Sequence, residues 1–268
     1  MSNIDETIRV AVAGACGRMG RLVVQTVLRQ PDMTLVSAID KQHVGEDIGT
    51  VAVEHPIGIQ VTDHLVEALS QTQPHVLVDF TTLGAAVSHV HTALEHRVIP
   101  VVGTSGFSAQ TLSDIREAVE RTGTPCIIVP NFALGAVLMM RFAREAARYF
   151  PHAEIVELHH EGKADAPSGT AIRTAEMIAA GRTETPRLPV QEQKFEGARG
   201  ATVAGVPIHS VRLPGLVAHQ MVLFGGQGEL LTIRHDSTDR QSFMPGVMLA
   251  IRKARHVRGL VVGLEHLL

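Results

Sequence analysis

A glycine-rich turn between an apolar strand and an amphipathic helix constrains the fold of this 268-residue chain more than any other feature. Residues 8–13 form a short apolar run rich in β-branched side chains, as is typical of a buried parallel strand. The turn Gly14-Ala15-Cys16-Gly17-Arg18-Met19-Gly20 follows, and residues 18–28 repeat apolar side chains with a helical period. Because residues 34–39 again have the pattern of a strand, the segment predicts one strand–helix–strand unit of a parallel sheet.

The alternation of strands and helices continues to residue 129. Further strands are predicted at 75–80, 98–103 and 126–129, and helices at 83–96 and 109–121. The strand at 126–129 is expected to close the series. Strands that alternate with helices of this length predict an α/β fold with a parallel sheet covered on both faces.

The pattern changes near residue 130, where a second domain is expected to begin. Helices are predicted at 134–149 and 170–180, and strands at 154–158, 206–213, 220–224 and 229–233. This order predicts an α+β domain with an open antiparallel or mixed sheet and helices on one side. The polar segment 181–205 is predicted to be a surface excursion, and 243–257 and 259–268 are helical in period. We therefore predict a first domain at 1–130, completed by 241–268, and a second at 131–240.

Composition excludes several classes of function. A net charge of -3 and a pI near 6.6 argue against a general nucleic-acid binder, and the single Tyr with no Trp argues against a base-stacking surface. No apolar run approaches the roughly 18 residues of a membrane span, and the polar start is unlike a signal peptide. The two cysteines form no disulfide framework, so we expect a cytoplasmic protein.

The glycine turn is suited to a dinucleotide. Its glycines permit a tight turn, and the following helix start brings backbone amides to a pyrophosphate. Asp40 ends the second strand, where an acid would meet the ribose hydroxyls, and Lys41 could meet a 2′-phosphate. The pair predicts use of NAD or NADP. The alternatives are a tight turn without a ligand and an ordinary solvated strand end.

Two later strand ends are candidates for the nicotinamide side of the same site. Gly103, Thr104 and Ser105 follow one strand, and Val129, Pro130, Asn131 and Phe132 follow the last. Open α/β sheets bind ligands at these carboxyl ends. A plain glycine turn and an interdomain hinge, respectively, are the alternatives.

The segment from Glu157 to Ala171 carries most of the chemistry. Its strand delivers His159, His160 and then Lys163 into a loop, and these side chains can supply protons and positive charge to an acidic substrate. The sequence Ser168-Gly169-Thr170 then opens a helix whose amides and hydroxyls suit a carboxylate. Ser168 could instead be only a helix cap.

Metal binding and thiol chemistry are less favoured. The His159-His160 pair has no further ligand at the spacing of a zinc motif, so we predict no metal. Cys16 is either an activated thiolate at a helix start or a small filler side chain.

Three motifs of the chain resemble those of bacterial dihydrodipicolinate reductases. They are G-A-C-G-R-M-G at 14–20, G-T-S-G-F at 103–107 and H-H-E-G-K-A-D-A-P-S-G-T-A at 159–171. The resemblance implies a Rossmann-type domain, a substrate domain that forms a homotetramer, and the reduction of a cyclic dicarboxylic imine with NADH or NADPH on the diaminopimelate route to lysine. Glu161-Gly162 and the 218–221 segment depart from the residues common in the family, which bears on substrate affinity.

The resemblance also implies a role for each matching residue. His159 would be the proton donor and acceptor, Lys163 a proton donor, and Arg240 a carboxylate ligand. The remaining residues fall into two sets: substrate ligands His160, Ser168, Gly169 and Thr170; cofactor ligands Gly14, Ala15, Cys16, Gly17, Arg18, Met19, Asp40, Lys41, Gly103, Thr104, Ser105, Val129, Pro130, Asn131 and Phe132.

Two other classes of protein stay open. A dinucleotide-binding sensor without chemistry is disfavoured by the intact cluster of His159, His160 and Lys163. A dehydrogenase of another small acid would usually need a nucleophilic cysteine in the second domain, whereas Cys126 precedes it in an apolar strand.

Overall fold

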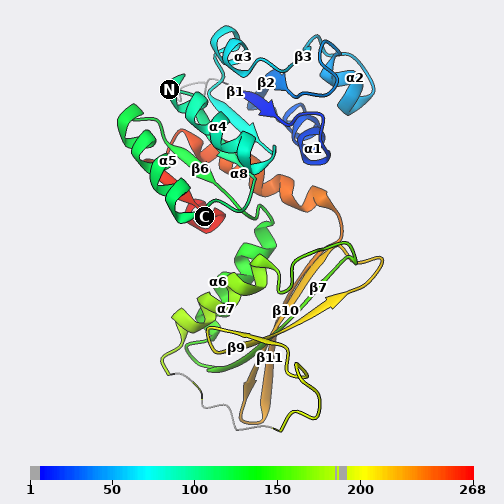
Figure 1. Cartoon of the computed structure of the whole chain (residues 1–268), viewed down its shortest axis with the longest axis vertical. Coiled ribbons are helices and arrows are strands. Elements are labelled where there is room, and N and C mark those ends of the chain that lie inside the picture. Colours follow the sequence, from blue (N-terminus) through cyan, green and yellow to red (C-terminus); the bar gives the residue numbers. More distant parts are fainter. Residues whose placement is uncertain (1–6, 185, 187–191) are drawn as a thin grey trace. The chain divides into compact units, whose positions relative to one another are not determined.

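The computed structural model describes residues 7–184, 186 and 192–268, and the chain divides into two compact units (Figure 1). The first unit extends to Phe132 and resumes at Phe243, and the second extends from Ala133 to Ser242. From the sequence, these boundaries are predicted after residues 130 and 240. None of the helices in the described ranges is both long and apolar enough to cross a membrane.

The first unit contains a seven-stranded parallel sheet with the spatial order β12-β6-β5-β4-β1-β2-β3. Its strands are β1 (Ile8–Ala13), β2 (Met33–Ile39), β3 (Val61–Thr62), β4 (Val76–Asp79), β5 (Ile99–Val102), β6 (Cys126–Ile128) and β12 (Leu260–Val262). Residues 10–13 of β1 are fully buried, as expected for a central strand covered on both faces. This confirms the predicted parallel α/β sheet.

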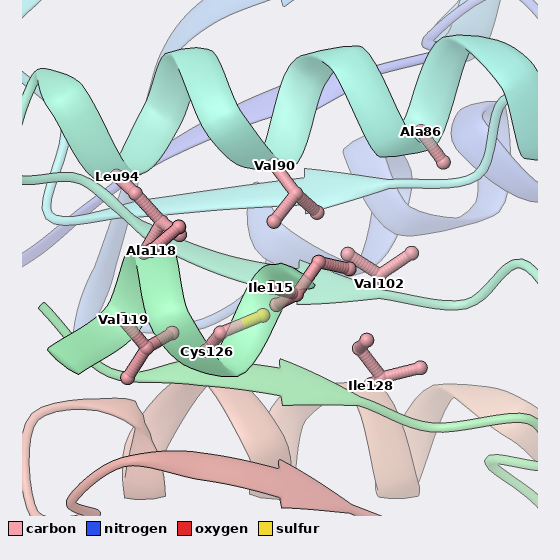
Figure 2. Packing of buried hydrophobic residues seen from close by; sticks show 9 residues of the cluster. All are labelled: Ala86, Val90, Leu94, Val102, Ile115, Ala118, Val119, Cys126 and Ile128. Carbon is pink, nitrogen blue, oxygen red and sulfur yellow. The ribbon is translucent and has the colours of Figure 1, made fainter. Parts of the chain in front are cut away.

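Helices pack against this sheet, and their apolar faces complete the core. They are α1 (Arg18–Val27), α2 (Ile48–Val53), α3 (Leu65–Thr72), α4 (Leu83–Glu95), α5 (Ala109–Thr122), α8 (Met244–Ala254) and the 3₁₀ helix η2 (Leu264–Leu267). Figure 2 shows α4 and α5 contributing Val90, Leu94 and Ile115 to one cluster with β5 and β6. The sulfur of Cys126 lies inside this cluster, and burial raises the pKa of its thiol. Cys126 is therefore a packing residue and not a nucleophile.

The end of the chain corrects two predictions. The strand at 126–129 does not close the sheet, because β12 pairs in parallel with β6 and adds an edge strand. Residues 259–268 are therefore not one helix. Gly259 and Gly263 both adopt positive φ and bound the short apolar run of β12, so the chain enters and leaves this strand by tight turns.

The second unit is built on a mixed five-stranded sheet with the order β11-β10-β7-β9-β8. Its elements are α6 (Leu134–Ala146), β7 (His152–His159), α7 (Gly169–Gly181), β8 (Ala201–Val203), β9 (Val206–Arg212), β10 (Ala218–Gly226), β11 (Glu229–Ser237) and the following 3₁₀ helix η1 (Arg240–Phe243). The central pair β7 and β9 is parallel and the other pairs are antiparallel. Helices α6 and α7 lie side by side and pack against the sheet (Figure 1).

The predicted surface excursion at 181–205 is only partly described. Residues 185 and 187–191 lie outside the described residues, and β8 occupies 201–203 as an edge strand paired with β9. The sequence did not predict this strand, which has only three residues.

Candidate active site

A cavity of about 650 Å³ opens at the carboxyl ends of the strands in the first unit. The strand order reverses there, because β2 lies on one side of β1 and β4 lies on its other side. Such a switch point is where doubly wound sheets bind ligands. The cavity is lined by Gly14, Gly17, Ile39, Asp40, Lys41, Gln42, Asp63, Phe80, Thr81, Thr82, Ala85, Ser88 and His89.

The glycine turn adopts a shape that larger residues would prevent. Gly14 has a φ of 74°, in the region that favours glycine. A Cβ on Gly20 would lie 1.9 Å from the carbonyl oxygen of Gly14, so α1 can start this close to β1 only without a side chain there. Gly17 is the N-cap of α1 and offers no side-chain cap. The first-turn amides therefore receive no side-chain cap and suit a phosphate.

Most backbone amides before the helix start donate hydrogen bonds to carbonyl oxygens of the first unit. Gly14 N and Ala15 N donate to the carbonyl oxygen of Ile39, at 2.8 and 3.2 Å, and Gly17 N donates to Gly14 O at 3.1 Å. Arg18 and Met19 begin the helix, where amides have no partner within the helix. Of the predicted pyrophosphate ligands, these first-turn residues have the amides best suited to that role.

Asp40 is fixed against the same turn. Its Oδ2 accepts from Cys16 N at 2.9 Å and its Oδ1 accepts from Gln42 N at 3.0 Å. An ionised carboxylate retains further acceptor sites after two such bonds, so Asp40 can still receive ribose hydroxyls. Lys41 is exposed on the wall of the cavity.

The structure decides between the two interpretations of Cys16. The side chain is buried, and burial together with the charge of Asp40 raises the pKa of the thiol to about 11. The thiol is therefore protonated near pH 7 and is not an activated nucleophile. Cys16 fills space in the turn, and its amide anchors Asp40.

Phe80 occupies the space beside Gly103. A Cβ on Gly103 would lie 2.1 Å from the ring of Phe80, so the glycine makes room for this side chain. Thr104 Oγ1 donates to Thr81 O at 2.8 Å and joins the two strand ends, while Ser105 is exposed. The structure thus brings the Gly103 turn to the Phe80 loop.

The segment after β6 meets the same aromatic side chain. The ring of Phe132 lies 5.6 Å from that of Phe80, centre to centre. Val129 is buried and donates to Val102 O at 2.8 Å, while Pro130 is exposed and Asn131 is half-buried. The predicted nicotinamide segments therefore both approach Phe80.

Sequence reasoning missed the loop after β4 and the start of α4. Asp79 is buried, and its carboxylate bonds Thr81 N at 2.8 Å and His89 Nδ1 at 2.7 Å. His89 and Ser88 line the cavity from α4. The signal available in the sequence was Asp79, an acidic residue at the end of a buried strand. Its carboxylate fixes the loop that follows.

In the second unit, strand register gathers a polar cluster around His159. His159 and Glu157 are two residues apart on β7 and share a face of the sheet. On β9, Arg212 lies opposite His159 and Ser210 opposite Glu157. Glu157 Oε2 bonds His159 Nδ1, and Arg212 Nη2 donates to Glu157 Oε1 at 2.8 Å.

Burial, hydrogen bonds and nearby charges shift the pKa values of Glu157 and His159. Glu157 is fully buried, yet hydrogen bonds from Arg212, Ser210 and His159 outweigh its desolvation and lower the pKa of its carboxyl. Burial lowers the pKa of His159, with Lys163 and Arg212 acting in the same direction and Glu157 opposing them. The imidazole is therefore mainly neutral near pH 7.

Arg212 also connects this cluster to the loop that carries Lys163. Its Nη2 donates to the carbonyl oxygen of Asp165 at 2.8 Å. Lys163 Nζ donates to Asp165 Oδ1 at 2.6 Å, which lowers the pKa of that carboxyl. The Lys163 side chain is 21% exposed and so is accessible to a ligand, and the neighbouring His160 is exposed.

The start of α7 follows the same loop. Ser168 is buried, and its Oγ accepts from Ala171 N at 3.2 Å, so Ser168 is the N-cap of α7, as in the alternative interpretation of this residue. Apart from the chain neighbours of Gly169 and the backbone of α7 itself, no described residue lies within 4 Å of a Cβ placed on Gly169, so space is open at the helix start beside half-buried Thr170. Arg240 is exposed in η1, and no hydrogen bond within residues 7–184, 186 and 192–268 links it to this group.

Among the described residues, no group of three or more His, Cys, Asp and Glu side chains is arranged to hold a metal ion. His159 Nδ1 is engaged by Glu157, and the adjacent His160 is exposed. Imidazole and ammonium groups such as those of His159 and Lys163 can transfer protons and bind anions.

A dinucleotide-binding sheet and a separate unit bearing proton donors define the class of an NAD(P)H-dependent oxidoreductase. The family models for the N-terminus and the C-terminus of dihydrodipicolinate reductase match residues 8–132 and 135–268. The chain belongs to the dihydrodipicolinate reductase family.

Individual relatives agree with this assignment. The 4-hydroxy-tetrahydrodipicolinate reductase of Moorella thermoacetica is 51% identical, with 98% of each chain covered, and that of Synechocystis sp. is 48% identical over the whole of both chains. A dipicolinate-bound dihydrodipicolinate reductase from Paenisporosarcina sp. TG-14 has a TM-score of 0.86 and 45% identity, covering 98% of this chain and 100% of that one.

Proposed function

We propose that this chain reduces 4-hydroxy-tetrahydrodipicolinate to tetrahydrodipicolinate with NADH or NADPH, a step of the diaminopimelate route to lysine. The observation that carries the proposal is the set of bonds that links His159 through Glu157 and Arg212 to the Lys163 loop, which precedes the capped start of α7. The relative from Paenisporosarcina was solved with dipicolinate, a planar ring with two carboxylates. A site of cations, hydroxyls and helix amides suits such a dianion.

Each carboxylate of the substrate would meet donors of the second unit. The first-turn amides of α7, with Gly169 and Thr170, would hold one carboxylate. His160 and Arg240, both exposed side chains, would meet the substrate from outside the helix start. Ser168 would hold the helix start in place through its bond to Ala171 N.

Lys163 and His159 would handle the protons. Loss of the 4-hydroxyl group as water gives the conjugated imine. Hydride then adds to a ring carbon and passes electron density into the conjugated system, so one proton must reach the ring. Lys163 carries an ammonium group and is the proposed donor. His159 has a neutral imidazole, so it can accept a proton and return it.

The dinucleotide would lie along the carboxyl edge of the first sheet. When bound, NADH or NADPH supplies the hydride. A cavity of about 650 Å³ next to an uncapped glycine turn fits the adenosine half, with Asp40 at the ribose and Lys41 near a 2′-phosphate. The pyrophosphate residues would be Gly14, Ala15, Cys16, Gly17, Arg18 and Met19, and the nicotinamide residues Gly103, Thr104, Ser105, Val129, Pro130, Asn131 and Phe132.

The decisive test supplies the aldol product of pyruvate and aspartate semialdehyde to the purified protein with NADH or NADPH. We expect the absorbance of the reduced nicotinamide to fall with time. Binding of the dinucleotide without this loss would identify a sensor. Oxidation with another small acid, but not with the imine, would identify a different dehydrogenase.

Replacing Ser168 with alanine tests the start of α7. Loss of the cap is expected to cost about 0.5–2 kcal/mol of unfolding free energy and to raise KM for the imine. Ser108→Ala is the matched control, because Ser108 caps α5 in the same way by accepting from Thr111 N at 3.1 Å. Thermal unfolding and steady-state kinetics of both variants give the comparison. Equal KM values for the two would show that Ser168 is only a cap.

A homotetramer in the cytoplasm completes the proposal. β11 is an edge strand of the second sheet, and its Leu230 and Leu231 are exposed. A contact with another subunit would cover these apolar side chains. Sedimentation of the purified protein measures the oligomeric state.

A further inference from the structure

We propose that Glu157 is a positioning residue for the reaction. Its buried carboxylate fixes His159 in the tautomer with the proton on Nδ1, and Arg212 holds that carboxylate and ties it to the Lys163 loop. This inference rests on the proposed function, in which His159 moves a proton, and it adds the group through which His159 is oriented.

The protonation state of Glu157 is set by its partners. Arg212 donates to both oxygens of Glu157, from Nη1 at 3.1 Å and from Nη2 at 2.8 Å. Two parallel charge-assisted bonds favour the ionised carboxylate. An ionised carboxylate can only accept hydrogen bonds, so the bond to His159 Nδ1 requires that Nδ1 carries the proton. The neutral imidazole then leaves Nε2 as the basic nitrogen.

The position of Glu157 makes this arrangement rigid. The Glu157 side chain is fully buried, whereas the His159 side chain is 14% exposed. Gln220 lies opposite Glu157 on β10, and its Nε2 donates to Thr174 Oγ1 of α7 at 2.7 Å. The carboxylate is therefore enclosed between two neighbouring strands, while the side chains of His159 and Arg212 are partly exposed.

Arg212 gives the carboxylate a second function. The same Nη2 atom that pairs with Glu157 donates to the carbonyl oxygen of Asp165. Asp165 in turn pairs with Lys163. The two proposed proton-transfer groups are thus held by one connected set of bonds, from His159 through Glu157, Arg212 and Asp165 to Lys163.

The charge of Glu157 also favours the imidazolium. Of the charged groups that act on His159, Glu157 raises the pKa of the imidazole, whereas Arg212 and Lys163 lower it. Burial is the largest influence and also lowers it. Removing the carboxylate charge removes the upward influence, so Glu157→Gln is expected to lower the pKa of His159 further.

Nuclear magnetic resonance of the full chain with isotope-labelled histidine reads the tautomer directly. The His159 signal is identified by its absence in His159→Asn. In the wild-type protein without ligands we expect neutral His159 to be protonated on Nδ1, and in Glu157→Gln we expect its titration at lower pH. Protonation on Nε2 in the wild type would overturn the proposal, and this reading does not depend on whether Glu157→Gln folds.

Kinetics provide the second reading. Glu157→Gln is expected to lower kcat about 100-fold, in the range of lost acid–base help, with KM for NADH changed less than about twofold. In the His159→Asn background the same substitution should change kcat less than about twofold, because Glu157 acts through His159. An equal loss in both backgrounds would show a purely structural role and reject the proposal.

Glu154→Gln is the matched control. Glu154 lies on the same strand and also bonds a histidine and an arginine, His209 and Arg199, but has no bond to His159. We expect the tautomer of His159 and kcat to be unchanged in this variant. If the wild-type protein fails to reduce the imine, the proposed function fails, while the tautomer still tests the contact of Glu157 with His159.

Discussion

Replacing Lys163 with alanine is expected to lower kcat by about 10²–10⁴-fold, the usual worth of a general acid. The variant loses the ammonium group that we propose as the donor to the reduced ring. His159 cannot substitute for it fully, because burial lowers the pKa of the imidazole and leaves it mainly neutral near pH 7. Steady-state kinetics with saturating NADH measure the loss.

Binding of the dinucleotide should be spared in this variant. Lys163 belongs to the second unit, whereas the cavity of about 650 Å³ is formed by the first unit alone. We expect the Kd for NADH to change less than about twofold. Lys194→Ala is the control, because Lys194 is an exposed lysine of the same unit. Unchanged kcat in Lys163→Ala would remove Lys163 from the proposed mechanism.

The local parts of the fold could be predicted because their signals are contiguous in the sequence. The apolar run of β1, the glycine turn and the apolar face of α1 follow one another within twenty residues. Together they predict one strand–turn–helix unit. The short elements α2 and β3 were missed, since six and two residues are too few to show a period. α2 instead depends on Asp47, whose carboxylate accepts from Gly49 N at 2.7 Å and Gly58 N at 2.6 Å.

The candidate site could be predicted in part for the same reason. Lys163 and the cap Ser168 lie close together in the sequence. Arg212 lies more than fifty residues beyond Glu157 in the chain, and only the parallel register of β7 and β9 brings the two together. The two-residue spacing of Glu157 and His159 did place them on one face, and that signal was available without the structure.

In the sheet of the first unit, too, the sequence does not show which distant residue contacts a given position. Gly103 is predicted to lie against the nicotinamide, and the structure shows that this glycine also makes room for the ring of Phe80. Small residues predict a close approach without specifying what approaches. The partner of such a glycine comes from a different strand, here the end of β4, and is set by the order of strands in the sheet.

Gly20→Ala is expected to have the second large effect, because helix propensity and packing oppose each other at this position. In an open helix, alanine in place of glycine gains up to about 1 kcal/mol. At Gly20 the new Cβ would lie 1.9 Å from Gly14 O and 2.8 Å from the Cα of Ala15. These are backbone atoms and cannot rotate away, so the turn and the start of α1 must move apart.

We expect Gly20→Ala to lower the unfolding free energy by about 1–3 kcal/mol, the usual cost of overpacking, despite its better helix propensity. The displaced turn should also raise the Kd for NADH at least about tenfold, since phosphate contacts depend on the geometry of these amides. Gly84→Ala in α4 is the stability control, because no described residue outside the backbone of α4 and the two chain neighbours lies within 4 Å of a Cβ placed there. Thermal unfolding should show opposite signs for the two variants. A Gly20→Ala protein as stable as the wild type, with unchanged NADH affinity, would show that the close approach of α1 to the turn is unnecessary for the site.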